Sequence, residues 1–342
     1  MEENSLDQKL RVAVVGAGIY GIHHVDVYNQ NPAVELVAVC DFSEEIRAKV
    51  EALYKVKTYA SVEEMLSNEK LDAVSIATPD HLHLEPALAC INKGLDILVE
   101  KPLATTVPDC EAILEAAEKN KVRVAVDFHK RWDPAAIYTY NQLNEGEHYP
   151  IRGYMNMDDT IDVPTKWFKW GNSSDPISFL GIHCADLMRW YMGCEATEVR
   201  AVGSKKLLPS MGVDTYDSVQ SMITFENGCT WLLENSWVLP SGFAKANDSR
   251  TTILTSEKYI RINNQNRGVE MVDSDKTHTP NVFFFNDFNG KVVGFGAEPI
   301  NDFVDSLLKG SDFLATGYDG LQAAKITAAI HQSLEEGKTV AI

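Results

Sequence analysis

Two side chains stand out because their types suit proton transfer and both lie in apolar runs. His183 lies in "SFLGIHCADLMRW", three residues before Asp186, so the two project from one face of an expected helix. An imidazole titrates near neutral pH and can accept a hydroxyl proton, although a buried structural histidine is the alternative. Lys101 follows the run "DILVE", where it could hold a substrate hydroxyl or be a solvated surface lysine. The sequence therefore predicts Lys101 and His183 as catalytic residues, with Asp186 as a support.

The pattern of the chain indicates which elements must position these residues. Its first third alternates short apolar runs with helical segments, which is typical of a parallel sheet covered on both faces. Longer β-type runs follow, joined at an Asn227-Gly228 turn, and they predict a mainly antiparallel sheet. The expected strands of the first part are 11–15, 35–40, 72–77, 96–100 and 123–128.

A glycine loop follows the first expected strand. In "GAGIYG", Gly16, Gly18 and Gly21 have the G-x-G-x-x-G spacing that allows a tight turn, a close approach of pyrophosphate, and packing of helix on strand. Asp41 ends the second strand, where an acid binds the adenosine ribose hydroxyls and repels a 2′-phosphate. Arg47 is expected to lie too far along the next helix to clamp a phosphate. NAD is therefore the expected cofactor, and NADP is disfavoured.

Charge and composition restrict the partners. With 31 Lys and Arg against 49 Asp and Glu, the formal net charge is −18, which opposes nucleic acid and anionic membranes and favours a small-molecule substrate. Six scattered cysteines without a C-x-x-C pair are expected to be reduced and buried. No apolar run approaches the length of a membrane span and no leader is recognisable, so a cytoplasmic location is expected.

Histidines elsewhere in the first third do not predict a metal site. His81 and His83 are expected to begin a helix, where side chains two residues apart diverge and no third ligand joins them. His23 and His24, after the glycine loop, are expected on the helix surface or in its packing. The aromatic segment 281–290 is expected to form a β-edge or a dimer contact.

Several segments together resemble one protein family, the Gfo/Idh/MocA oxidoreductases. They are "VVGAGIYG", "ATPDHLH" (77–83), "EKPLA" (100–104), "FHKRWDP" (128–134), "GIHCADLMRW" (181–190) and "GYDGLQA" (317–323), and the resemblance covers essentially the whole chain. It implies an α/β fold with an N-terminal Rossmann doubly wound parallel sheet, residues 1–127, that binds NAD. An α/β domain with a large, mainly antiparallel open sheet and C-terminal helices would follow at 128–342, bind substrate and form a homo-oligomer, a dimer or a tetramer.

The resemblance also implies an activity, which is NAD(P)-linked hydride transfer to or from a sugar, cyclic polyol or related carbohydrate. It implies a cis bond before Pro102 and places Arg131 and Trp132 at the start of the second domain, near the substrate. The expected substrate-binding residues are then Lys101, Arg131, Trp132 and His183. The expected cofactor-binding residues are Gly16, Gly18, Ile19, Tyr20, Gly21, Asp41, Thr78, Pro79, His83, Glu100, Lys101 and Pro102.

One position departs from the family pattern. Many sugar-oxidising members carry an aspartate four residues before the histidine, where this chain has Phe179. The acids that could fill the gap are Asp158, Asp159, Asp162 and Asp175. The departure leaves two alternatives open: a glycoside-cleaving enzyme that retains NAD and oxidises its substrate transiently, or a non-catalytic NAD-binding regulatory protein on the same fold.

Overall fold

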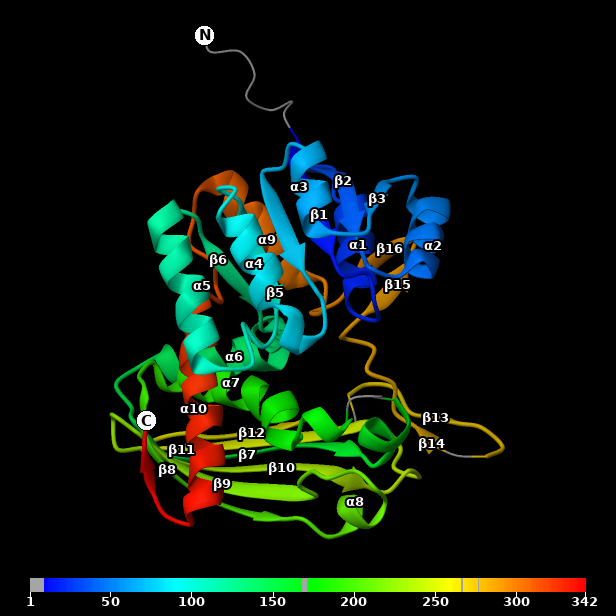
Figure 1. Cartoon of the computed structure of the whole chain (residues 1–342). Coiled ribbons are helices and arrows are strands. Elements are labelled where there is room, and N and C mark those ends of the chain that lie inside the picture. Colours follow the sequence, from blue (N-terminus) through cyan, green and yellow to red (C-terminus); the bar gives the residue numbers. More distant parts are fainter. Residues whose placement is uncertain (1–8, 168–170, 266, 276) are drawn as a thin grey trace. The chain divides into compact units, whose positions relative to one another are not determined.

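The computed structural model describes residues 9–167, 171–265, 267–275 and 277–342, which form two compact units (Figure 1). The first unit runs to Trp132 and also contains Phe283–Leu321, whereas the second contains Asp133–Val282 and Gln322–Ile342. This division differs from the expected boundary between 127 and 128 in two ways: the first break comes five residues later, and a late segment of the chain returns to the first unit.

The first unit is built on a sheet of six parallel strands in the order β3-β2-β1-β4-β5-β6. The apolar runs of the sequence form strands because both faces of the sheet are covered by helices, so nearly every strand residue is buried. The strands are β1 Leu10–Val15, β2 Val34–Cys40, β3 Lys57–Tyr59, β4 Ala73–Ile76, β5 Asp96–Glu100 and β6 Val124–Asp127. The predicted Rossmann doubly wound sheet is therefore confirmed.

Five helices connect these strands: α1 Gly21–Gln30, α2 Glu44–Tyr54, α3 Val62–Asn68, α4 Leu84–Ile91 and α5 Val107–Asn120. Three of them begin at a hydroxyl side chain that accepts a hydrogen bond from the N–H three residues on, at Ser43, Ser61 and Thr106. The strand order reverses between β1 and β4. Ligands of doubly wound sheets bind beyond the carboxyl ends of the strands at such a reversal.

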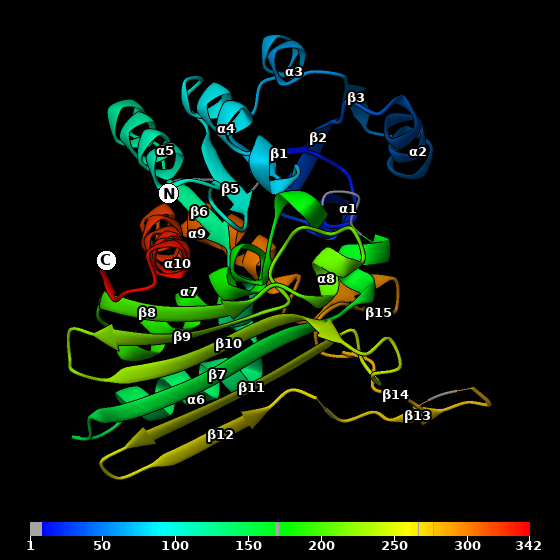
Figure 2. The same cartoon turned by 60° about the horizontal axis from the view of Figure 1, so that its bottom comes forward.

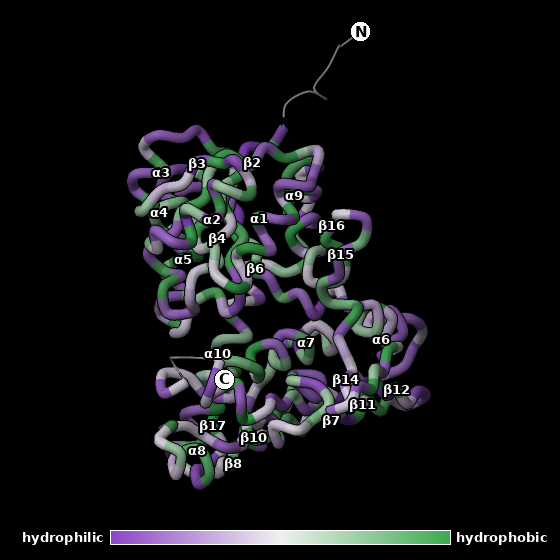
Figure 3. The backbone as a smooth tube through the Cα atoms, turned by 90° about the vertical axis from the view of Figure 1, so that its right-hand side faces the viewer, coloured by the Kyte–Doolittle hydropathy of each residue, from purple (hydrophilic) through white to green (hydrophobic). Residues whose placement is uncertain are grey.

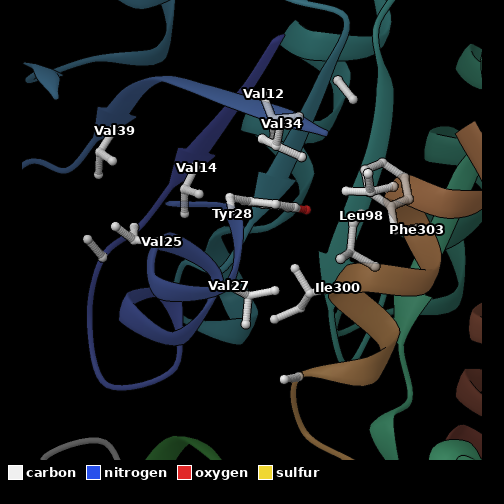
Figure 4. Packing of buried hydrophobic residues seen from close by; sticks show 14 of the residues in the cluster. Val12, Val14, Val25, Val27, Tyr28, Val34, Val39, Leu98, Ile300 and Phe303 are labelled. Carbon is white, nitrogen blue, oxygen red and sulfur yellow. The ribbon is translucent and has the colours of Figure 1, made fainter. Parts of the chain in front are cut away.

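The core of the first unit explains why 283–321 belongs to it. Helix α9, Glu298–Lys309, contributes Ile300 and Phe303 to the same buried cluster as Val12, Tyr28 and Leu98 (Figure 4). Before α9, the ring of Phe285 stacks on that of His23, 4.0 Å between centroids. Phe285 therefore packs within this unit, so the expectation of a β-edge or dimer contact is wrong for it, whereas Phe283 and Phe288 are exposed. A short hairpin, β15 Asn286–Phe288 and β16 Lys291–Val293, lies between Phe285 and α9 along the chain.

The second unit is built on a sheet of seven strands in the order β12-β11-β7-β10-β9-β8-β17 (Figure 2). Only β7 and β10 run parallel among the neighbouring pairs, so the predicted mainly antiparallel sheet is confirmed. The strands are β7 Pro150–Thr160, β8 Ala196–Ser204, β9 Ser218–Phe225, β10 Thr230–Leu239, β11 Asn247–Thr255, β12 Tyr259–Asn263 and β17 Val340–Ala341. A smaller hairpin is formed by β13 Met271–Val272 and β14 Thr277–His278.

Strands β9 and β10 are joined at the Asn227-Gly228 turn as expected, with Gly228 at a positive φ of 79°. Buried and more exposed residues alternate along both strands. Trp231 and Leu233 are buried, whereas Met222 and Leu232, which face each other across the two strands, are about half exposed. One face of the sheet therefore forms the core, and the other is open within the described chain.

The helices of the second unit are α6 Pro134–Asn144, α7 Ile182–Met192, α8 Leu207–Ser210 and most of α10 Gly317–Glu336, whose first residues belong to the first unit. Short 3-10 and π segments complete the chain: η1 Asp80–Leu82, η2 His129–Trp132, η3 Val163–Trp167, η4 Gly171–Ser173 and η5 Ile177–Gly181. No helix in the described residues is long and apolar enough to cross a membrane. Hydrophobic and hydrophilic residues are interleaved along both units in Figure 3.

Candidate functional site

The glycine loop is packed so tightly against the sheet that two of its glycines admit no side chain. A Cβ on Gly21 would lie 1.9 Å from the carbonyl oxygen of Gly16, and one on Gly16, at φ +88°, would lie 2.7 Å from the backbone of Ala77. A Cβ on Gly18 would meet no protein atom within 4 Å. The next two residues, Ile19 and Tyr20, expose 76% and 41% of their surface. The loop thus presents backbone and apolar side chains to an open side, as a cradle for a dinucleotide would.

Asp41 ties the glycine loop to the end of β2. Its Oδ2 accepts the N–H of Ala17 at 2.9 Å, and its Oδ1 accepts the N–H of Ser43 at 2.9 Å. Arg47 reaches back from α2 and donates to the carbonyl oxygens of Asp41, at 2.8 Å, and Phe42, at 3.0 Å. The expectation that Arg47 lies too far along the helix is therefore wrong, since one turn of helix brings its guanidinium beside Asp41.

The segments after β4 and β5 are joined by one buried histidine. His83 is fully buried, with Nδ1 2.7 Å from the carbonyl oxygen of Pro102 and Nε2 2.9 Å from that of Thr78. Thr78 also donates its hydroxyl to the carbonyl of Leu82 at 3.1 Å. His81 is exposed, so the two histidines do diverge as predicted. His83 fixes the shape of the two strand exits, Pro79 included, rather than presenting a free ring.

Lys101 is 8% exposed at the carboxyl end of β5. A solvated surface lysine is therefore wrong for this position. Its N–H donates to Oε2 of Glu100 at 3.2 Å, and the Lys101–Pro102 bond is cis, as the resemblance implied. Because β5 is the second strand from the reversal of strand order, Lys101 leaves the sheet in the region where this class of fold binds ligands.

Sequence reasoning missed a polar cluster behind Lys101. His24 is buried on α1, as packing would require, but its contacts are polar: Nε2 lies 3.2 Å from Oε1 of Glu100 and 3.6 Å from Oδ2 of Asp127. Its Nδ1 lies 3.2 Å from the hydroxyl oxygen of Ser75, which is 2.6 Å from that of Tyr28. The available signal was an acid closing each of two apolar runs, "DILVE" and "RVAVD".

Arg131 and Trp132 end the first unit rather than beginning the second. Arg131 is 3% exposed, donates to the carbonyl of Leu314 at 2.6 Å and pairs with Asp319 at 3.0 Å. Asp319 also accepts the N–H of Thr316 at 2.8 Å, and the positive charge of Arg131 helps to hold its pKa below the usual value against the effect of burial. Arg131 thus anchors the "GYDGLQA" segment, and Trp132 is half-buried.

In the second unit, His183 lies in the first turn of α7 and is 6% exposed. The π-helix η5 precedes it, and such segments occur frequently at functional sites. Asp175 caps η5, since its Oδ1 accepts the N–H groups of Ile177, at 2.7 Å, and Ser178, at 3.0 Å. Its Oδ2 lies 2.9 Å from Nε2 of His331 on α10. Hydrogen bonds from His331 and Ser178 hold the pKa of Asp175 below its usual value despite burial.

Phe179 lies within η5, with its ring 5.9 Å from that of Trp237. The other acids considered as replacements all have local partners. Asp158 accepts from Asn156 and Ser236, Asp159 from Asn247, and Asp162 from Ser241 and Lys166. Asp186 is fully buried one turn beyond His183. Asp158, Asp159 and Asp162 are thus each engaged in a local contact, and Asp186 is buried.

A six-stranded doubly wound sheet with this glycine loop defines an α/β dinucleotide-binding protein. The model described as "Oxidoreductase family, NAD-binding Rossmann fold" matches residues 10–128, and that of the "GFO/IDH/MocA C-terminal domain" matches residues 146–261. These two ranges together span more than half of the chain. The chain belongs to the Gfo/Idh/MocA oxidoreductase family, and its first unit is an NAD-binding Rossmann domain.

Relatives and solved structures match along nearly the whole chain. The uncharacterized oxidoreductase YrbE of Bacillus subtilis (strain 168) is 25% identical, with 98% of each chain covered. The inositol 2-dehydrogenase of Rhizobium meliloti (strain 1021) is 24% identical, over 97% of this chain and 99% of the relative. The structure of scyllo-inositol dehydrogenase from Lactobacillus casei, with bound NAD(H) and scyllo-inositol, has a TM-score of 0.83 at 19% identity, covering 98% and 99% of the two chains.

Proposed function

We propose that the protein is an NAD-dependent dehydrogenase or reductase that interconverts a hydroxyl and a keto group on a sugar or cyclic polyol. The observation that carries the proposal is the buried Lys101 at the carboxyl end of β5, in a unit of the NAD-binding Rossmann class. A lysine so little exposed is not a solvated surface residue, so its burial calls for a function. It also leaves the sheet near the reversal of strand order, where ligands bind in this class of fold. Relatives that act on inositol support this choice of substrate class.

The residues around the glycine loop fit a dinucleotide. Gly18 leaves open the space that a side chain would fill, and the N-terminus of α1 directs backbone N–H groups toward a pyrophosphate. Ile19 and Tyr20 would flank it. Asp41 would accept hydrogen bonds from the adenosine ribose, which favours NAD over NADP, and the remaining predicted contacts come from Thr78, Pro79, His83, Glu100, Lys101 and Pro102.

In the proposed reaction, the Lys101 ammonium donates a hydrogen bond to the substrate hydroxyl and fixes its orientation. His183 accepts the hydroxyl proton on its imidazole as the carbon is oxidised, and returns it in the reverse direction. When bound, the nicotinamide supplies the hydride acceptor or donor. Asp186 would support the helix turn that holds His183. This scheme needs no acid at position 179. The phenylalanine there would instead change which substrates the site accepts.

The test is a screen of inositols, aldoses, glycosides and sugar acids with NAD and NADP, following reduced nicotinamide by absorbance. On the best substrate, Lys101→Ala and His183→Ala should each lower kcat by about 10²- to 10⁴-fold, the usual contribution of a positioned proton-transfer group. Binding of NAD to His183→Ala, measured by calorimetry, should change by less than about threefold, or about 0.65 kcal/mol, because His183 is not among the predicted cofactor contacts. The matched controls are Lys93→Ala, an exposed lysine of the same unit, and His148→Ala, a half-buried histidine of the second unit.

Four outcomes would contradict the proposal or one of its parts. Full activity in both Lys101→Ala and His183→Ala would remove the catalytic assignment. Glycoside cleavage without net NADH would favour the NAD-retaining enzyme, and NAD binding without turnover of any substrate would favour a regulatory protein. A clear preference for NADP would refute the role given to Asp41.

A further inference from the structure

Two buried carboxylates are forced together by the register of the parallel sheet. Glu100 and Asp127 are the last residues of β5 and β6 and are direct partners in the pairing of these strands. Side chains of paired residues project to the same face of a sheet, so these two acids meet on one side of it. His24 approaches both from α1, and the contacting atoms of the three side chains lie within 4.8 Å of one another.

All three side chains are removed from water. His24, Glu100 and Asp127 expose 1%, 8% and 2% of their surface. Two ionised carboxylates at this separation would repel each other strongly in a low-dielectric interior, and one of them is expected to retain a proton. The distances of 3.2 Å and 3.6 Å from Nε2 of His24 to the two acids are those of hydrogen-bonded or closely paired groups, so a shared proton is sufficient to explain the geometry.

The surroundings identify Asp127 as the acid that keeps the proton. Glu100 has a partner on each oxygen, Nε2 of His24 and the backbone N–H of Lys101. Burial and the neighbouring Glu100 raise the pKa of Asp127 well above its usual value, against the opposing effects of the His129 N–H and Lys101. Burial also holds the pKa of His129 well below its usual value, so His129, 3.9 Å from Asp127, supplies no positive charge near neutral pH.

Other groups facing the cluster leave that assignment intact. From α1, the hydroxyl of Tyr28 hydrogen-bonds to Ser75, and burial raises the pKa of Tyr28 so that it stays neutral. From α9, which packs against β6, the side chains in the buried core are the apolar Ile300, Phe303 and Val304. His23, also on α1, interacts with His24 and Glu100, and burial lowers its pKa so that it is neutral near neutral pH. Lys101, at the exit of β5, is the charged neighbour that acts on Asp127.

We propose that His24, Glu100 and Asp127 form a buried proton-holding cluster in which Asp127 keeps the proton, and that this cluster positions Lys101. The second half rests on the function proposed above. A chain of contacts runs from Ser75 through both nitrogens of His24 to Glu100, and Glu100 accepts the backbone N–H of Lys101, which fixes the main chain where the lysine leaves β5. With one proton retained, the two acids carry a single negative charge that complements one lysine ammonium. None of the three is a catalytic residue, because none touches the substrate in this scheme.

The first test measures the proton without using activity. Asparagine has the shape of the neutral aspartic acid. The infrared difference spectrum between wild type and Asp127→Asn should therefore show that the variant lacks the C=O stretch of a protonated carboxylic acid. The folded state holds this proton more tightly than the unfolded chain, so the contribution of Asp127 to stability is complete below the unfolded pKa and is lost as pH rises toward the folded pKa. The Tm of Asp127→Asn relative to wild type should therefore rise between about pH 5 and about pH 9.

The matched control is Asp217→Asn, another buried aspartate with the opposite shift. Asp217 accepts the N–H groups of Lys206, Leu207 and Leu208 at 2.7, 2.8 and 2.7 Å, and these hydrogen bonds lower its pKa despite burial. Its stabilising contribution is present above the unfolded pKa and is lost only as pH falls, so Asp217→Asn should show a constant deficit over the same range. A constant deficit for Asp127→Asn, no acid band, or a stoichiometric metal ion in the purified protein would each overturn the shared proton.

The second test concerns Lys101 and also avoids activity. Amine labelling of the apo protein, read by peptide mass spectrometry, should be at least about fivefold faster at Lys101 in Glu100→Gln. The NH2 group of the amide cannot accept the backbone N–H of Lys101 while its oxygen accepts from His24, so the strand exit that carries Lys101 loses this contact. Labelling of Lys101 in Asp127→Asn should stay within about twofold of wild type, and Lys93 should be unchanged in both. Unchanged Lys101 labelling in Glu100→Gln would overturn the positioning role. If these results hold and no substrate is oxidised, the proposed reaction fails while the cluster stands.

Discussion

Replacing Gly21 by alanine separates the packing of the glycine loop from its binding role. The added Cβ would lie 1.9 Å from the carbonyl oxygen of Gly16 and 3.2 Å from Cβ of Ala77. Ordinary contacts between heavy atoms lie near 3.5 Å, so the backbone of β1 or α1 would have to move by more than about 1 Å. Overpacking of this kind costs up to about 3 kcal/mol, which lowers Tm by about 6–12 °C in a unit of this size.

The matched variant is Gly18→Ala, because a Cβ there meets no protein atom within 4 Å. Its Tm should stay within about 2 °C of wild type, since removing a glycine at an unstrained position changes stability by less than about 1 kcal/mol. Its Kd for NAD should rise at least about tenfold, about 1.4 kcal/mol, because the methyl group occupies the side of the loop proposed for the pyrophosphate. Calorimetry of unfolding and of NAD binding measures both quantities.

The comparison has a clear negative result. If Gly21→Ala has the same Tm as wild type, the inferred close packing of Gly21 against the carbonyl oxygen of Gly16 is wrong. If Gly18→Ala binds NAD as tightly as wild type does, the pyrophosphate does not lie on this loop in the way proposed.

Three further predictions concern other contacts. His331→Ala should lower Tm most between about pH 4 and about pH 7. The pKa of Asp175 is lowered, so the stabilisation from Asp175 is lost as pH falls. The pKa of His331 is raised by its pairing with Asp175, so the stabilisation from His331 is lost as pH rises. A deficit that does not vary with pH would contradict this. Asp133→Ala removes the cap of α6 and breaks the buried pair with Arg267, at 2.5 Å and 2.9 Å, and should cost about 3 kcal/mol by chemical unfolding. A cost below about 1 kcal/mol would show the pair to be dispensable. Asp41→Ala should raise the Kd for NAD about tenfold and narrow the discrimination against NADP in calorimetric titrations; unchanged selectivity would refute its role.

The sequence by itself determined five of the six strands of the first sheet, because its information is local, and it missed only the short edge strand β3. Apolar runs such as "RVAVV" and "DILVE" predict strands buried on both faces, and the position of Gly228 predicts a hairpin turn. The three glycines mark the turn after β1 from spacing alone. Lys101 and His183 could be nominated in the same way, as polar residues closing or interrupting apolar segments, although their proposed roles await the experiments above.

Tertiary structure decided what depends on contacts between residues distant along the chain. The pairing of Glu100 with Asp127 follows from the register of β5 and β6, which the separate runs do not encode, and it gives His24 a polar rather than an apolar environment. Arg131 pairs with Asp319, nearly two hundred positions away, an association that spacing cannot predict. Local patterns fix which residues are buried, and only the packing of the elements fixes which buried polar groups satisfy one another.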